Sequence, residues 1–133
     1  MTHIFDAKKT REYFNGLESD ISFVSKSDLP RKDIFFELIL PLCLKKKSGD
    51  FRIVDFGCGG GRLLKGLLDR KLDAVGIDKH EELCRSTRAL IGRSGYPAKR
   101  VLKGGVEALR SFSKESVDLV LVMGVMQYLS NED

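Results

Sequence analysis

Three glycines spaced two residues apart, Gly57, Gly59 and Gly61, follow an apolar run that starts at Phe51, and a leucine-rich stretch comes directly after them. Glycine lets the backbone turn sharply and approach a ligand with no Cβ in the way. A helix that begins at such a turn presents its N-terminal N–H groups to the same place. The pattern therefore predicts a strand, a turn and a helix that together bind a cofactor.

The position of the third glycine separates two classes of cofactor that use this kind of turn. A dinucleotide site favours G-x-G-x-x-G, which needs glycine at position 62, where this chain has Arg62. The observed spacing is D-x-G-x-G-x-G, from Asp55 to Gly61. This spacing resembles the first motif of the class I S-adenosylmethionine-dependent methyltransferases. Binding of a nicotinamide dinucleotide stays open as the weaker alternative.

Three further segments follow in the order and spacing of that family. An apolar stretch at 74 to 77 ends at Asp78, about twenty residues past the turn, where a carboxylate can accept from ribose hydroxyls. Residues 103 to 109, KGGVEAL, resemble the family's adenine-lining segment, G-D-A-E-x-L. Residues 117 to 123, VDLVLVM, resemble its fourth strand, F-D-L-V-x-x. The resemblance covers about residues 51 to 129.

The resemblance implies a site for S-adenosyl-L-methionine. It assigns the glycine turn to the methionine portion, Asp78 to the ribose, and Met123 to the wall beside the sulfonium. Lys79 and Val106 are expected at the adenine faces and Glu107 at its polar edge. Asp55 has a second interpretation of equal weight, in which it bonds the N–H groups of the turn itself. The expected cofactor-binding residues are Asp55, Phe56, Gly57, Cys58, Gly59, Gly61, Asp78, Lys79, Gly105, Val106, Glu107 and Met123.

Two departures from the family pattern bear on function. Gly105 stands where the family has an acidic residue that accepts from the adenine amino group, so Val106, Glu107 and backbone groups would hold the base. Met123 is followed by GVMQYL and not by Asp/Asn-Pro-Pro-Tyr, which argues against methylation of DNA adenine or of glutamine amides. The resemblance thus implies an enzyme that methylates a small-molecule acceptor. No catalytic residue is identified, because positioning alone can drive such a transfer.

Composition limits the class of protein. With 133 residues the chain has room for one domain. No run reaches the ~18 apolar residues of a membrane span, and the polar N-terminus lacks the apolar run of a signal peptide, so we expect a cytoplasmic protein. The three cysteines, Cys43, Cys58 and Cys84, are widely spaced and form neither a zinc pattern nor a disulfide framework. We expect all three to be reduced and structural, and no metal site.

The formal charge of +4 includes a cluster of basic residues between Arg85 and Lys103. These residues could bind an anionic partner such as RNA. A solvated helix face explains them without any ligand, and we favour that interpretation. A nucleic-acid partner is left as an unsupported alternative.

The order of elements predicts the fold class. Residues 1 to 30 are expected to form a cap segment with a short helix near 8 to 17, either over the cofactor or on the surface. Residues 31 to 133 are expected to form the cofactor-binding half of a single domain. The expected elements of this half are a helix over 31 to 47 that Pro41 kinks or restarts, strands at 51–56, 73–77, 100–103 and 117–123, and helices at 61–70 and 80–92. Right-handed crossovers make this a Rossmann-like α/β fold, a mostly parallel sheet with helices on both faces.

The last predicted strand raises the question of what completes the sheet. Residues 117 to 123 are apolar on both alternations apart from Asp118, as in a central strand covered on both faces. The resembling fold continues with three more strands, so we expect this one to be truncated after the fourth. A bare strand of this kind pairs with another chain. We therefore expect a homodimer or a second chain that completes the sheet, and the alternative function is a non-catalytic fragment or regulatory subunit that associates through this strand.

Overall fold

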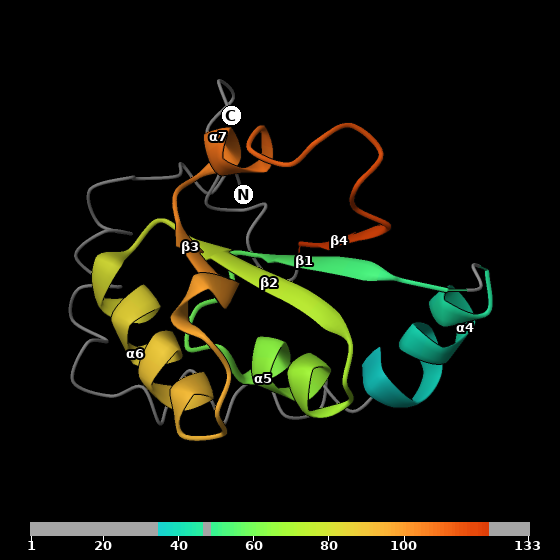
Figure 1. The fold of residues 1–133 in the computed structure, drawn as a ribbon, viewed down its shortest axis with the longest axis horizontal. Coiled ribbons are helices and arrows are strands. Elements are labelled where there is room, and N and C mark those ends of the chain that lie inside the picture. The colour runs from blue at the N-terminus through green and yellow to red at the C-terminus, as the bar shows by residue number, and fades with distance from the viewer. Residues whose placement is uncertain (1–34, 47–48, 123–133) are drawn as a thin grey trace, which may run out of the picture.

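A four-stranded parallel sheet forms the centre of the computed structural model, which describes residues 35–46 and 49–122 (Figure 1). Its strands are β1 (Arg52–Phe56), β2 (Asp73–Asp78), β3 (Val101–Lys103) and β4 (Leu119–Leu121). They lie in the order β3-β2-β1-β4, and every neighbouring pair is parallel. The predicted Rossmann-like α/β class is confirmed. The cap segment at 1–30 with its helix at 8–17, and Met123 with the residues after it, lie outside the described residues.

The path of the chain places a switch point beside β1. From β1 the chain moves to β2 and then to β3 on one side, and it returns to β4 on the other side of β1. The register sets Ile53 of β1 opposite Ala74 of β2 and Leu119 of β4. In open parallel sheets, ligands bind outside the carboxyl ends of the strands where the strand order reverses in this way.

Helices α5 (Arg62–Asp69) and α6 (Glu81–Gly92) cover one face of the sheet (Figure 1). Helix α5 turns Leu64, Leu67 and Leu68 inward, a spacing of three and four residues that forms one apolar side. Burial of each such side chain stabilises the fold by about 1.5–3 kcal/mol. The buried cluster on this face comprises Phe35, Phe36, Leu40, Ile53, Leu64, Leu67, Leu68, Ala74, Cys84, Ile91, Val101 and Leu121.

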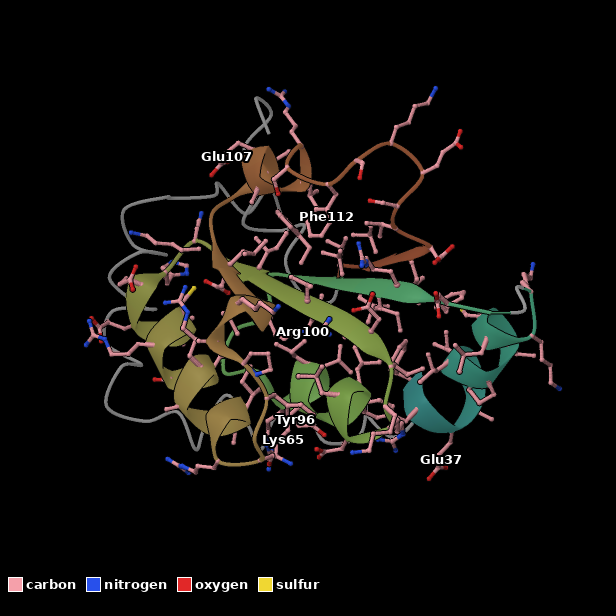
Figure 2. The ribbon with its side chains drawn as sticks, in the orientation of Figure 1. Glu37, Lys65, Tyr96, Arg100, Glu107 and Phe112 are labelled. Carbon is pink, nitrogen blue, oxygen red and sulfur yellow. The ribbon has the colours of Figure 1, made fainter. Side chains whose placement is uncertain are left out.

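The opposite face is covered by the short helix α7 (Val106–Leu109) and the segment that follows it (Figure 1). Three fully packed side chains belong to the sheet here, Val54, Phe56 and Ile77. Partly buried residues pack over them, among them Phe112, which Figure 2 shows between α7 and the sheet. Helices thus lie on both faces, as predicted. The sequence pattern did not indicate α7, because four residues are too few to show helical periodicity.

The segment before β1 restarts near Pro41, in agreement with the prediction. A π-helical turn, η2 (Phe35–Ile39), is followed by α4 (Leu40–Leu44). Pro41 lies in the first turn of α4, where the missing N–H of proline leaves no helical bond unmade.

Strand β4 is shorter than the predicted strand at 117–123. Its start is fixed by two bonds to β1: Asp118 N–H donates to the Arg52 carbonyl at 2.9 Å, and Arg52 N–H donates to Asp118 Oδ2 at 2.8 Å. Val120 and Val122 keep 42% and 38% of their surface exposed. In the described part of the chain, β4 is an edge strand, as expected. None of the described helices is long and apolar enough to cross a membrane.

Candidate cofactor-binding site

The turn after β1 is built from glycines in left-handed conformations. Gly57, Gly59 and Gly61 have φ angles of 74°, 52° and 79°, which residues with a Cβ adopt only under strain. Gly61 is also the N-cap of α5. The N–H groups of Gly57 and Cys58 donate to the Ile77 carbonyl at 2.7 and 2.9 Å, so the turn is fastened to the end of β2. The predicted need for glycine at all three positions is confirmed by these angles.

Both backbone polar groups of Gly59 form hydrogen bonds with side chains, and the space at its Cβ position is open. Its N–H donates to Asp78 Oδ2 at 3.0 Å, and its carbonyl accepts from Thr87 Oγ1 at 2.7 Å. A Cβ built on Gly59 would meet no atom of the described residues within 4 Å. The turn therefore presents open space to a ligand at a backbone position that is fixed by side chains from β2 and α6.

Asp78 uses most of its accepting capacity inside the protein. Besides the bond from Gly59, its Oδ1 accepts from the His80 N–H and lies 2.9 Å from His80 Nδ1. A carboxylate has about four lone-pair sites, so these three contacts leave about one for an outside donor. The predicted ribose contact thus has room for about one hydroxyl.

Asp55 lies beneath the turn as a buried carboxyl. Only 3% of its surface is exposed, and its Oδ2 has no hydrogen-bond partner in the described part of the chain. Burial, with a further contribution from the charge of Asp78, raises the pKa of Asp55 to about 7. The carboxylate that bonds the turn's own N–H is Asp78. Asp78 therefore has the structural role expected for Asp55, which is to accept a hydrogen bond from the turn. Asp55 Oδ2 has no hydrogen-bond partner among the described residues.

The third predicted segment reaches the same edge of the sheet. Gly104 N–H donates to the Asp78 carbonyl at 2.9 Å, which places the start of α7 beside the end of β2. Val106 packs on the second face of the sheet. Glu107 is exposed, and its Oε1 accepts from the Gly105 N–H at 2.7 Å, so this carboxylate caps its own short helix (Figure 2).

Eleven of the twelve predicted residues therefore lie at the carboxyl ends of β1, β2 and β3, and Met123 lies outside the described residues. They do not all offer side chains. Phe56 packs into the core of the second face, and Cys58 packs against Gly76, so these two can contact a ligand only through the backbone. Lys79 is exposed at the end of β2. The arrangement fits a nucleoside-containing cofactor, because open space at Gly59, a helix N-cap at Gly61 and two carboxylates converge there.

The cysteines carry no chemistry in this arrangement. All three are free, and Cys58 and Cys84 are buried. Burial raises the pKa of both of these thiols, which disfavours the reactive thiolate. Within the described residues, no group of His, Cys, Asp or Glu is arranged to hold a metal ion.

Four of the basic residues between Arg85 and Lys103 pair with acidic groups of the protein. Arg85 lies 2.8 Å from Glu82, and Lys103 lies 3.3 Å from Glu81. Arg100, labelled in Figure 2, pairs with Asp73 at the start of β2. These pairs agree with a solvated helix face and need no anionic ligand.

Sequence reasoning missed two residues of the site. Thr87 was not considered, although it lies on the buried side of α6 with Leu83, Cys84 and Ile91, and a polar residue at such a position needs a partner. The other is His80, the N-cap of α6. Its ring contact with Asp78 depends on the loop after β2 and has no sequence signal.

Comparisons with known proteins give the family. No curated protein matches the chain. The structure is similar to three structures of WbdD. A high-resolution crystal structure has a TM-score of 0.57 and 22% sequence identity to this chain. A medium-resolution structure of WbdD, described as a bifunctional kinase-methyltransferase, has a TM-score of 0.55 and 21% identity, and a complex with the kinase inhibitor LY294002 has a TM-score of 0.56 and 22% identity. Each likeness covers 68% of this chain and about a fifth of WbdD (21%, 20% and 21%), and at this identity it shows the fold alone. The methyltransferase domain family matches residues 53–133. The chain therefore belongs to this family of class I S-adenosylmethionine-dependent methyltransferases.

Proposed function

We propose that this chain binds S-adenosyl-L-methionine at the turn of residues 57 to 61 and that the complete site transfers a methyl group to a small-molecule acceptor. The observation that carries the proposal is the turn itself. Its three left-handed glycines lie at the carboxyl end of β1, beside the switch point, and Gly59 faces open space. Membership in the methyltransferase domain family supports the same cofactor.

In this proposal, the residues of the turn and its neighbours bind the cofactor and orient it. The backbone of Gly57, Gly59 and Gly61 holds the methionine portion. Asp78 accepts from one ribose hydroxyl with the capacity that its internal bonds leave. The buried Oδ2 of Asp55 lies at the carboxyl end of β1, next to the turn, and has no hydrogen-bond partner in the described part of the chain.

The adenine lies against the third segment. Lys79 and Val106 flank the base and Glu107 faces its polar edge, and to do so Glu107 gives up its bond with Gly105. The cofactor, when bound, supplies a methyl group that is already activated by its sulfonium. The protein then needs only to hold the acceptor in line, and orientation of this kind contributes about 7–11 kcal/mol.

Two observations favour a small-molecule acceptor over a nucleic acid or a protein. Several basic residues near α6 and β3, Arg85, Arg88, Arg100 and Lys103, form ion pairs with acidic groups of the protein and need no nucleic acid as a partner. The sequence after Met123 also differs from the Asp/Asn-Pro-Pro-Tyr pattern.

Titration calorimetry tests the cofactor. We expect S-adenosyl-L-methionine and its demethylated product, S-adenosylhomocysteine, to bind the purified chain, and NADH not to bind. Mass spectrometry of ligand released from the freshly purified protein gives an independent answer. Binding of NADH with neither adenosyl ligand would contradict the proposal.

A second candidate is a non-catalytic or regulatory chain that associates through β4. The exposed Val120 and Val122 favour it, because an apolar strand with an unpaired edge is a template for pairing. The partner is a second copy or another chain that completes the sheet. Light scattering on the 133-residue chain, with a methyl-transfer assay over a panel of small acceptors, tests this candidate. A dimer without turnover supports it, whereas a monomer that turns over at ~1 per second excludes it.

A further inference from the structure

Thr87 lies 28 residues after Gly59 in the sequence and contacts the turn directly. Its side chain is fully buried on the apolar side of α6. Its hydroxyl donates to the Gly59 carbonyl at 2.7 Å. A buried hydroxyl needs a hydrogen-bond partner, and this one finds it in the turn and not in its own helix.

A second contact joins the same two segments. A Cβ built on Gly61 would lie 2.3 Å from Thr87 Cγ2 and 2.9 Å from Thr87 Oγ1. No side chain fits at position 61 without moving Thr87. The methyl and the hydroxyl of Thr87 therefore contact two of the three left-handed glycines, one by packing and one by a hydrogen bond.

We propose that Thr87 is a positioning residue that holds the turn in its cofactor-binding conformation; the inference rests on the proposed function. Gly59 is fixed at its N–H by Asp78 and at its carbonyl by Thr87. Glycine loses more conformational freedom on ordering than any other residue, so a turn of glycines gains the most from a fixed peptide plane. A turn that is ordered before the ligand arrives binds it more tightly, because the ligand does not have to order it.

Two variants separate positioning from packing. Thr87→Val keeps the branched shape and loses the hydroxyl, whereas Thr87→Ser keeps the hydroxyl and loses the methyl group. Two ligands separate the turn from the rest of the site. S-adenosylhomocysteine has the amino-acid portion that the turn is proposed to hold, and 5′-methylthioadenosine lacks it.

The experiment measures the affinity of both ligands for the three proteins by calorimetry, and the melting temperature of each protein. We expect Thr87→Val to weaken S-adenosylhomocysteine binding by about 5- to 150-fold, the range for one lost hydrogen bond with its acceptor left unpaired. The affinity for 5′-methylthioadenosine should change much less, so the ratio of the two affinities falls. Thr87→Ser should restore the wild-type ratio.

Three results count against the proposal. An unchanged S-adenosylhomocysteine affinity in Thr87→Val overturns it while the proposed function stands. Equal weakening of both ligands, together with a lowered melting temperature in both variants, also overturns it, because that result describes a residue that only packs the core. A wild-type chain that binds neither ligand overturns the proposed function and this inference with it.

Discussion

The two glycine-containing turns at the carboxyl edge of the sheet are built in different ways. The turn after β1 has left-handed glycines, and side chains from β2 and α6 hold Gly59. The turn after β3 contains Gly104 and Gly105, and Gly105 donates to the side chain of Glu107, two residues along the same segment. The first turn leads into α5, an eight-residue helix, and the second into α7, which has four residues.

The difference shows which end of the proposed ligand the protein fixes. Contacts from distant elements hold the first turn rigidly, because several packed segments must move together to change it. The second turn relies on a local, exposed contact that water can replace. We therefore expect the glycine turn and Asp78 to contribute most of the binding energy, and the adenine segment to contribute less.

Gly59→Val is the strongest test of the first turn. Valine fills the open space where the ligand approaches, and we expect affinity for S-adenosylhomocysteine to fall by more than ~100-fold while helical content by circular dichroism persists. Gly95→Val is the matched control. Gly95 also has a positive φ, 82°, and open space around its Cβ, but it follows α6. Equal loss of affinity in both variants would show that backbone strain, and not the ligand, causes the effect.

Asp55, at the start of the first turn, gives the fold a pH dependence. Its folded pKa of about 7 lies above the usual carboxyl value, so the folded state holds a proton that the unfolded state releases between about pH 4 and 7. The contribution of Asp55 to the free energy of unfolding therefore falls by up to about 4 kcal/mol as pH rises through that window. Above the window it stays constant.

Asp55→Asn removes this loss. The melting temperature of the variant should therefore rise relative to that of the wild type between pH 4.5 and pH 8. Asp73→Asn is the control with the opposite sign. Burial raises the pKa of Asp73, but bonds from Arg52 and Arg100 outweigh it and lower the pKa. Its variant should lose stability at neutral pH and approach the wild type in acid. Parallel pH curves for wild type and Asp55→Asn would show that Asp55 is ionised in the fold.

Asp78→Ala should weaken cofactor binding by ~1–3 kcal/mol, the cost of hydrogen bonds to a charged acceptor that go unmade. It also frees the Gly59 N–H, so both the ribose contact and the turn are affected. Asp73→Ala, at the other end of β2, is the control for general destabilisation and should leave affinity unchanged. Calorimetry with S-adenosylhomocysteine gives the numbers, and an unchanged affinity in Asp78→Ala would exclude the ribose role.

Glu107→Ala should have the smallest effect, below about 1 kcal/mol in binding, since an exposed group exchanges one partner for another. Adenosine is the appropriate ligand, because it isolates the base and ribose. A loss larger than that of Asp78→Ala would reverse the comparison and make the second turn the principal contact.

Local pattern predicted most of the fold. The strands and helices from β1 to β3 begin and end within one or two residues of their predicted bounds, because apolar periodicity and glycine mark these ends locally. The short helix α7 was not predicted, because four residues are too few to show helical periodicity. Strand β4 was predicted at the edge of the sheet, and only its length differs, three residues against the seven predicted.

The sequence by itself determined where the glycine turn lies, that it follows a strand, and which acidic residues end near it. These are local properties of residue type and spacing. Only the tertiary structure decided that Asp78 and not Asp55 accepts from the turn, and that Thr87 holds the Gly59 carbonyl. Those contacts join residues 19 and 28 positions apart. They depend on the register of β1 against β2 and on the rotation of α6 over the sheet, which packing of the whole core sets and no short motif encodes.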